Sequence, residues 1–96
     1  MRTEKTLILA ARNGDKEAFS ELVRLCDQRV MAVLSGMFAN REDALDVYQD
    51  TFISAFRGLP KFNYECSFTT WIYRIAVNTG MSFRRKRGRR PSILET

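Results

Sequence analysis

The segment from residue 62 to residue 90 combines aromatic rings, an amide and a run of positive charge. The letters FNYECSFTTWIYRIAVN cover residues 62–78, and RRKRGRR follows at residues 84–90. Aromatic rings can stack on unpaired bases for about 1–3 kcal/mol each, an amide can read a base edge, and Arg and Lys neutralise phosphates. These residue types in this order predict binding to single-stranded nucleic acid.

A loop followed by a helix is expected to hold this site. Phe62 and Phe68 would form one wall of a pocket for a base. Asn78, two turns along the helix from Trp71, would close the pocket with hydrogen bonds. Each ring also has an interpretation as a core residue, because rings near a helix start commonly pack inward. That interpretation is stronger for Phe68 and Trp71 than for Phe62, which stands between polar neighbours.

One face of the same helix carries polar and basic groups. Its members recur at spacings of three or four residues, which places them along one side of an α-helix: Trp71, Arg74, Asn78, Ser82 and Arg85. The ordinary alternative for Asn78 is a surface amide without a partner. Its alignment with Arg74 and Arg85 favours a functional role.

Positive charge is concentrated in the last third of the chain. Residues 1–60 carry eight basic and nine acidic groups, whereas residues 61–96 carry eight basic and two acidic groups. This asymmetry indicates a polyanionic partner, and the neighbouring aromatic residues favour nucleic acid over a lipid surface. A solvated basic tail would be the better interpretation if the Arg run stood alone.

The chain lacks the residues of common metal and catalytic sites. It has no His, and Cys26 and Cys66 form no Cys-x-x-Cys pair, so neither a zinc site nor a disulfide framework is expected. Gly-rich phosphate loops and nucleophile–base pairs are also missing, so we expect no enzyme, no cofactor and no metal. We recognise no signal peptide or membrane span, which favours a cytoplasmic protein with reduced thiols and no membrane partner.

Apolar residues recur at helical spacing nearly throughout, which predicts an all-α fold, a compact bundle of about four helices. We expect helices over residues 3–12, 16–38, 42–59 and 68–88, with a Thr hydroxyl capping the last one. Gly14 would end the first helix and Pro60 the third. Cys26 lies in the apolar stripe of the second helix and is expected to be a small buried hydrophobe.

An acidic strip follows the predicted third helix on the side opposite its apolar residues. The strip consists of Asp43, Asp46, Gln49 and Asp50. Its ordinary interpretation is a solvated helix face, with Asp43 also complementing the helix dipole. Phe52 belongs to the apolar side and is expected to face the core.

Two stretches resemble region 2 of the extracytoplasmic-function sigma factors, the small members of the bacterial sigma-70 family, especially the envelope-stress type. These stretches are REDALDVYQDTFISAFRGLPKF at residues 41–62 and SFTTWIYRIAVNTGMSFRRKRGRRP at residues 67–91. The resemblance covers nearly the entire chain. It implies a helical domain over residues 1–90, with residues 91–96 beginning a linker to a helix-turn-helix domain that the 96 residues do not include.

The resemblance also implies partners and site residues. Region 2 in this family binds the clamp helices of the RNA polymerase beta-prime subunit. It recognises the promoter minus-ten element and helps to melt it by capturing a flipped base of the non-template strand. An anti-sigma factor is a further implied partner.

Specific residues match the motifs of the family. Those matching the polymerase-binding motif are Asp46, Gln49, Asp50 and Phe52. Those matching the pocket for the flipped base are Phe62, Ser67, Phe68 and Asn78. Those expected to follow the phosphate backbone are Arg74 and the basic run of Arg84, Arg85, Lys86, Arg87, Arg89 and Arg90.

The sequence departs from the family pattern at two positions, and two other functions stay open. Leu45 stands where many relatives carry Glu, and Ser82 where many carry Asp. The first alternative is a protein-interaction module held by an anti-sigma factor. The second is a general single-strand binder, which would not depend on the acidic strip.

Overall fold

Four α-helices and a short 3-10 helix form the described part of the chain, residues 3–88 of a computed structural model. They are α1 Glu4–Arg12, α2 Lys16–Met37, α3 Arg41–Gly58, η1 Leu59–Lys61 and α4 Phe68–Gly88. No strand occurs within residues 3–88, so the predicted all-α bundle is confirmed. The predicted helix bounds agree to within one residue, and the expected linker at residues 91–96 lies outside the described range.

Short polar side chains determine where the first three helices begin. Thr3, Asp15 and Asn40 each precede a helix and accept a hydrogen bond from a backbone N–H of its first turn. Asp15 Oδ1 accepts from Ala18 at 3.1 Å, and Asn40 Oδ1 accepts from Glu42 at 2.7 Å. Because first-turn N–H groups lack partners within the helix, these side chains stabilise each helix start.

Gly14 and Pro60 mark helix boundaries, as predicted. Gly14 has a φ of 96°, a left-handed conformation that glycine adopts without steric cost, and it lets the chain turn from α1 into α2. Pro60 lies at the start of η1, where the missing N–H leaves no hydrogen bond unmade. The chain then enters the loop of residues 62–67 that leads to α4.

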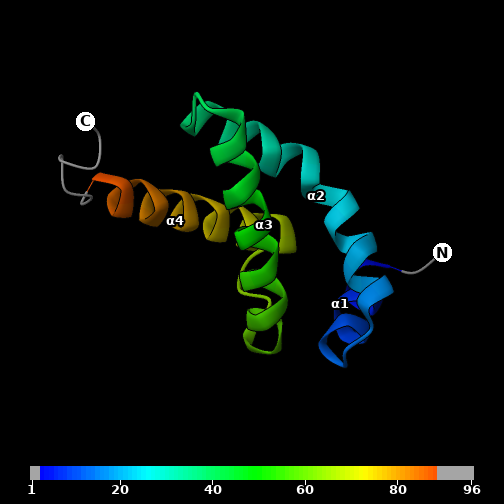
Figure 1. Cartoon of the computed structure of the whole chain (residues 1–96). Coiled ribbons are helices and arrows are strands. Elements are labelled where there is room, and N and C mark those ends of the chain that lie inside the picture. Colours follow the sequence, from blue (N-terminus) through cyan, green and yellow to red (C-terminus); the bar gives the residue numbers. More distant parts are fainter. Residues whose placement is uncertain (1–2, 89–96) are drawn as a thin grey trace.

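The helices are arranged so that α4 packs against two other helices. In Figure 1, α2 arches over the molecule, α3 returns from its far end, and α4 crosses beside α3 and extends outward. Helix α1 packs against α2, whereas α4 packs against both α2 and α3. The described domain is elongated, with extents of 53 × 22 × 22 Å. One side of α4 is therefore covered, and the other is left for contacts outside the domain.

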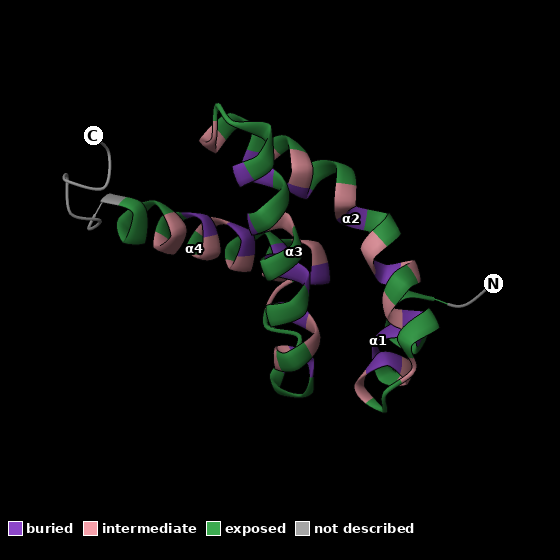
Figure 2. Cartoon of the chain, in the orientation of Figure 1, coloured by how far each residue is buried: buried purple, intermediate pink, exposed green. Residues whose placement is uncertain are grey.

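The buried residues lie on the facing sides of the helices (Figure 2). The largest fully buried side chains are Ile8, Leu22, Leu34, Leu59, Ile72, Val30, Val47, Thr51 and Cys26. Burial raises the pKa of the Cys26 thiol to about 11, and its Sγ donates to the Leu22 carbonyl at 3.5 Å. Cys26 thus stays neutral and packs as a small apolar residue, as predicted.

Within residues 3–88, no helix has the length and apolar character that crossing a membrane requires.

Candidate nucleic-acid interface

The loop before α4 is built on a cluster of three aromatic rings. The centroid of Phe62 lies 6.0 Å from that of Phe68 and 5.1 Å from that of Trp71, and Phe68 lies 5.8 Å from Trp71. Phe62 is 3% exposed and Phe68 is 2% exposed, while Trp71 is half-buried. Both rings therefore belong to the core, and their part in a pocket for a base stays a prediction.

The exposed aromatic residue of this loop is Tyr64, which the sequence analysis missed. Its ring lies 4.9 Å from that of Phe62, is 44% exposed, and has the guanidinium of Arg12 at 5.4 Å. Tyr64 has a φ of 63°, a left-handed backbone conformation that is uncommon for residues other than glycine. Its phenolic hydroxyl was the available signal, because a polar tip favours a surface position for Tyr over Phe.

Ser67 begins α4 as its N-cap residue. Its Oγ accepts a hydrogen bond from the Thr70 backbone N–H at 3.1 Å and donates to Thr70 Oγ1 at 2.9 Å. The prediction that a Thr hydroxyl caps this helix is wrong, because α4 already begins at Phe68 and the residue before it is Ser67. Ser67 remains exposed next to the aromatic cluster.

A polar stripe on α4 faces away from the core. Arg74, Asn78 and Arg85 are all exposed, as the sequence predicts. No hydrogen bond from another described residue reaches the Asn78 amide. Arg74 Nη1 lies 3.9 Å from Cys66 Sγ, and Arg85 Nη2 donates to Ser82 Oγ at 3.1 Å. The stripe therefore offers an amide and two guanidinium groups to a ligand.

The described part of the basic run, Arg84 to Arg87, is exposed, and one of its members is also paired. Arg84, Arg85 and Lys86 are exposed in the last turns of α4. Arg87 also donates from Nη1 to Asp43 Oδ2 on α3 in an ion pair, and its guanidinium lies over the Phe83 ring at 5.2 Å. Arg87 is therefore engaged by Asp43, and the expectation that it follows a phosphate backbone stays a prediction. Arg89 and Arg90 lie outside the described residues.

The acidic strip on α3 is shorter than predicted. Asp46, Gln49 and Asp50 are exposed, whereas Asp43 is 7% exposed and bound to Arg87. The interpretation of Asp43 as a solvated residue is wrong, because α4 crosses the start of α3 and covers it. Phe52 is buried, as predicted.

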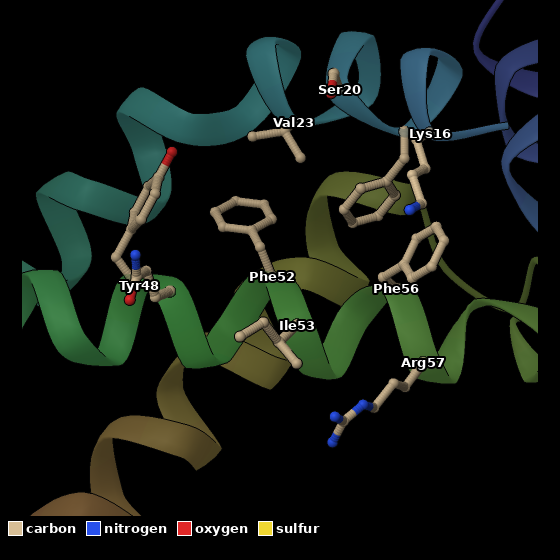
Figure 3. A pocket seen from close by; sticks show the side chains of 10 residues that line it. Lys16, Ser20, Val23, Tyr48, Phe52, Ile53, Phe56 and Arg57 are labelled. Carbon is tan, nitrogen blue, oxygen red and sulfur yellow. The ribbon is translucent and has the colours of Figure 1, made fainter. Parts of the chain in front are cut away.

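An apolar groove of about 560 Å³ runs between α2 and α3, next to this strip. In Figure 3, Phe52 and Phe56 on α3 and Val23 on α2 point toward one another across it, with Tyr48 toward one end. Its lining consists of Lys16, Phe19, Ser20, Val23, Tyr48, Gln49, Phe52, Ile53, Phe56 and Arg57. Gln49 and Phe52 thus belong both to the groove and to the motif on α3.

Metal chemistry has no support in the described residues. Among residues 3–88, no group of three or more His, Cys, Asp or Glu side chains is placed to hold a metal ion.

The described chain is an all-helical domain with an exposed polar stripe on α4 and exposed carboxylates on α3. The sigma-70 region 2 family model matches residues 22–90, and the chain belongs to this family. The resemblance to region 2 of the extracytoplasmic-function sigma factors is thereby confirmed.

Curated relatives are extracytoplasmic-function and related sigma factors. The ECF RNA polymerase sigma-E factor of Haemophilus influenzae is 40% identical over 89 residues, which cover 93% of this chain and 47% of the relative. The RNA polymerase sigma-H factor of Pseudomonas aeruginosa is 36% identical over 88 residues, which cover 92% of this chain and 46% of the relative. The chain therefore spans about half the length of the curated relatives it matches.

A solved structure has the same fold. It is the NMR structure of an engineered region 2 of sigmaE in complex with GTAAAA, 37% identical in sequence. It superposes with a TM-score of 0.84 and covers 93% of each chain. The four-helix architecture is thus that of a sigma region 2.

Proposed function

We propose that this chain binds RNA polymerase core and recognises a promoter minus-ten element during transcription initiation in the bacterial cytoplasm. The observation that carries the proposal is the exposed stripe of Arg74, Asn78 and Arg85 beside the aromatic loop. The structural neighbour, which has this fold, was solved in complex with GTAAAA, and we assign the same kind of ligand to this face. The non-template single strand would be bound as the two promoter strands separate.

The base-capturing group is Asn78, with Tyr64 as the nearby ring that a base can stack on. The Asn78 amide offers donors and an acceptor without a described partner, and such an amide can pair with a base edge. Phe62 and Phe68 support the loop from beneath, so they shape the site without stacking on the strand in this conformation. Ser67, exposed at the helix start, borders the same site.

The phosphate contacts belong to Arg74, Arg84, Arg85 and Lys86, whose side chains are exposed. Each phosphate neutralised on a single strand releases counterions and contributes about −0.7 to the slope of log affinity against log salt. Free binding to DNA is expected to be weak, because sequence-specific opening of the duplex depends on the polymerase.

The polymerase contact is assigned to three exposed residues of α3, the acidic Asp46 and Asp50 and the neutral Gln49. Asp46 and Asp50 are negative, whereas the nucleic-acid face is positive, so each face attracts a partner of opposite charge. Phe52 lies beneath them and adjoins the apolar groove, which would receive apolar side chains of the beta-prime clamp helices. An anti-sigma factor would compete with polymerase by covering the same side.

The test measures how tightly wild type and variants of the chain bind labelled single strands. The strands are GTAAAA and versions of it changed at one position. Asn78→Ala should reduce the discrimination between strands by about 1–3 kcal/mol, as expected for loss of a base contact. Gln28→Ala, which removes an exposed amide on α2, is the matched control and should change nothing. An equal loss on all strands would make Asn78 a backbone contact, and a wild-type chain that does not discriminate would contradict base capture.

The polymerase contact is tested by charge reversal at Asp46 and Asp50. Assembly with core polymerase should be lost while the fold persists, because exposed substitutions usually change stability by about ±0.5 kcal/mol. Strand preference should be unaltered. Normal assembly would contradict the assigned polymerase surface.

A further inference from the structure

The ion pair between Asp43 and Arg87 joins the start of α3 to the end of α4, across 44 positions of the chain. Among the described residues, Asp43 and Thr51 are the buried polar side chains, and of these two Asp43 carries a charge. Burying a carboxylate without a partner is strongly unfavourable, and removing one partner of a buried pair leaves that penalty in place. Arg87 is therefore the partner that permits Asp43 to be covered.

Arg87 belongs to a stripe of α4 that packs against the corner where α2 ends. A Cβ placed on Gly80 would lie 2.8 Å from Met37 Cε, so the two helices approach closely at this point. Phe83 meets Phe38 edge to face, with 5.5 Å between the ring centroids. Arg87 stacks over Phe83 while it binds Asp43. Spacings of three and four residues place all three α4 positions on one side of the helix.

The nucleic-acid stripe lies on the opposite side of the same helix. At 3.6 residues per turn, each residue advances by about 100°, so Arg87 points about 160° away from Arg85. Asn78 and Arg85, seven residues apart, share a face to within about 20°. Arg87 therefore cannot face the strand together with Asn78 and Arg85 while α4 is helical.

We propose that Asp43 is a positioning residue for nucleic-acid binding and that Arg87 is its anchor, not a phosphate contact. This inference rests on the proposed function. By fixing the last turn of α4, the pair holds Arg84, Arg85 and Lys86 on a formed helix before the strand arrives. A preorganised surface binds more tightly because less ordering remains to be done on binding. Without the pair, the final turn frays and these groups lose their fixed direction.

The inference predicts an effect opposite in sign to simple electrostatics. Asp43→Asn removes a negative charge from a protein of net charge +5, so charge alone predicts tighter binding to DNA. The anchoring role predicts binding of single-stranded GTAAAA weakened about fivefold, an effect typical of interactions between contacting residues. Glu42→Gln is the matched control, because Glu42 is exposed, adjacent, and in the same first turn of α3. It should leave binding unchanged or slightly tighter.

Salt dependence separates an anchor from a phosphate contact. Arg85→Gln should reduce the slope of log affinity against log salt by about 0.7, as for one lost phosphate contact on a single strand. Arg87→Gln should weaken binding about as much as Asp43→Asn and leave the slope within error. The double variant should bind no more weakly than either single variant, because both remove the same interaction. A slope reduced in Arg87→Gln as in Arg85→Gln would overturn the anchoring role.

Amide hydrogen exchange in the 96-residue chain tests the anchor without DNA. Residues 84–87 should exchange about tenfold faster in Asp43→Asn and Arg87→Gln than in wild type or Glu42→Gln, because local opening becomes easier. Unchanged exchange in both variants would overturn the inference. A wild-type chain that fails to bind GTAAAA would instead contradict the proposed function, while the exchange measurement would still decide the anchor.

Discussion

Replacing Phe62 with alanine tests whether this ring supports the loop from inside or meets a base from outside. Phe62 is 3% exposed, and three other rings surround it at centroid distances of 4.9, 6.0 and 5.1 Å. Truncating a buried Phe to Ala costs about 3–5 kcal/mol, through lost transfer free energy and the cavity left behind. The free energy of unfolding of a domain is about 5–15 kcal/mol, so Phe62→Ala should remove a large share of it.

The neighbouring ring is the matched control. Tyr64 is 44% exposed, and it contacts the tilted ring of Phe62 and the guanidinium of Arg12. Tyr64→Ala should lower the free energy of unfolding by about 1 kcal/mol or less, and it should weaken strand binding by about 1–3 kcal/mol through loss of stacking. Phe62→Leu keeps an apolar side chain in the core and should bind the strand nearly as wild type does.

Urea unfolding followed by far-ultraviolet circular dichroism measures the first quantity, and titration of labelled GTAAAA measures the second. Binding should be measured at a temperature where each variant remains folded. If Phe62→Ala unfolds within about 1 kcal/mol of wild type while strand binding is lost, the reasoning from burial is refuted. Phe62 would then be the stacking residue that the family resemblance implies.

Three further predictions concern the backbone and the thiols. In a thermal melt, Gly14→Ala should lower the free energy of unfolding by about 1–2 kcal/mol, because the φ of residue 14 is 96°. Gly36→Ala, inside α2 and with open space for a methyl group, should raise the free energy of unfolding by about 1 kcal/mol. Iodoacetamide at pH 8 should modify half-buried Cys66 well before Cys26. Because folding raises the Cys26 pKa from 9.0 to about 11, its stabilising contribution is present below pH 9 and lost as pH rises toward 11. Urea midpoints between pH 8 and pH 11 measure this decline, which Cys26→Ala should reduce.

Local patterns were sufficient to predict the helices. The apolar stripes have a period near 3.6 residues, and the glycine at position 14 and the proline at position 60 act within a few residues of themselves. Such features depend on neighbouring backbone groups, so they can be interpreted without knowledge of the fold. The same periodicity identified Arg74, Asn78 and Arg85 as one exposed face.

The loop of residues 62–67 could not be predicted in the same way. It has no period, so whether Phe62 or Tyr64 faces the core depends on the rings of Phe68 and Trp71 and on the turn at Tyr64. Polar neighbours in the sequence suggested exposure for Phe62, but packing between segments decided otherwise. Tyr64 was missed for the same reason.

The sequence by itself determined an all-helical domain of the sigma-70 region 2 family, with positive charge on its last helix and negative charge on the preceding one. Only the tertiary structure decided which charges are free. Asp43 and Arg87 are exposed-looking members of two charged segments, yet the crossing of α4 over the start of α3 buries one and pairs it with the other. Burial of a charge depends on contacts between residues distant in the chain, and local periodicity contains no information on such contacts.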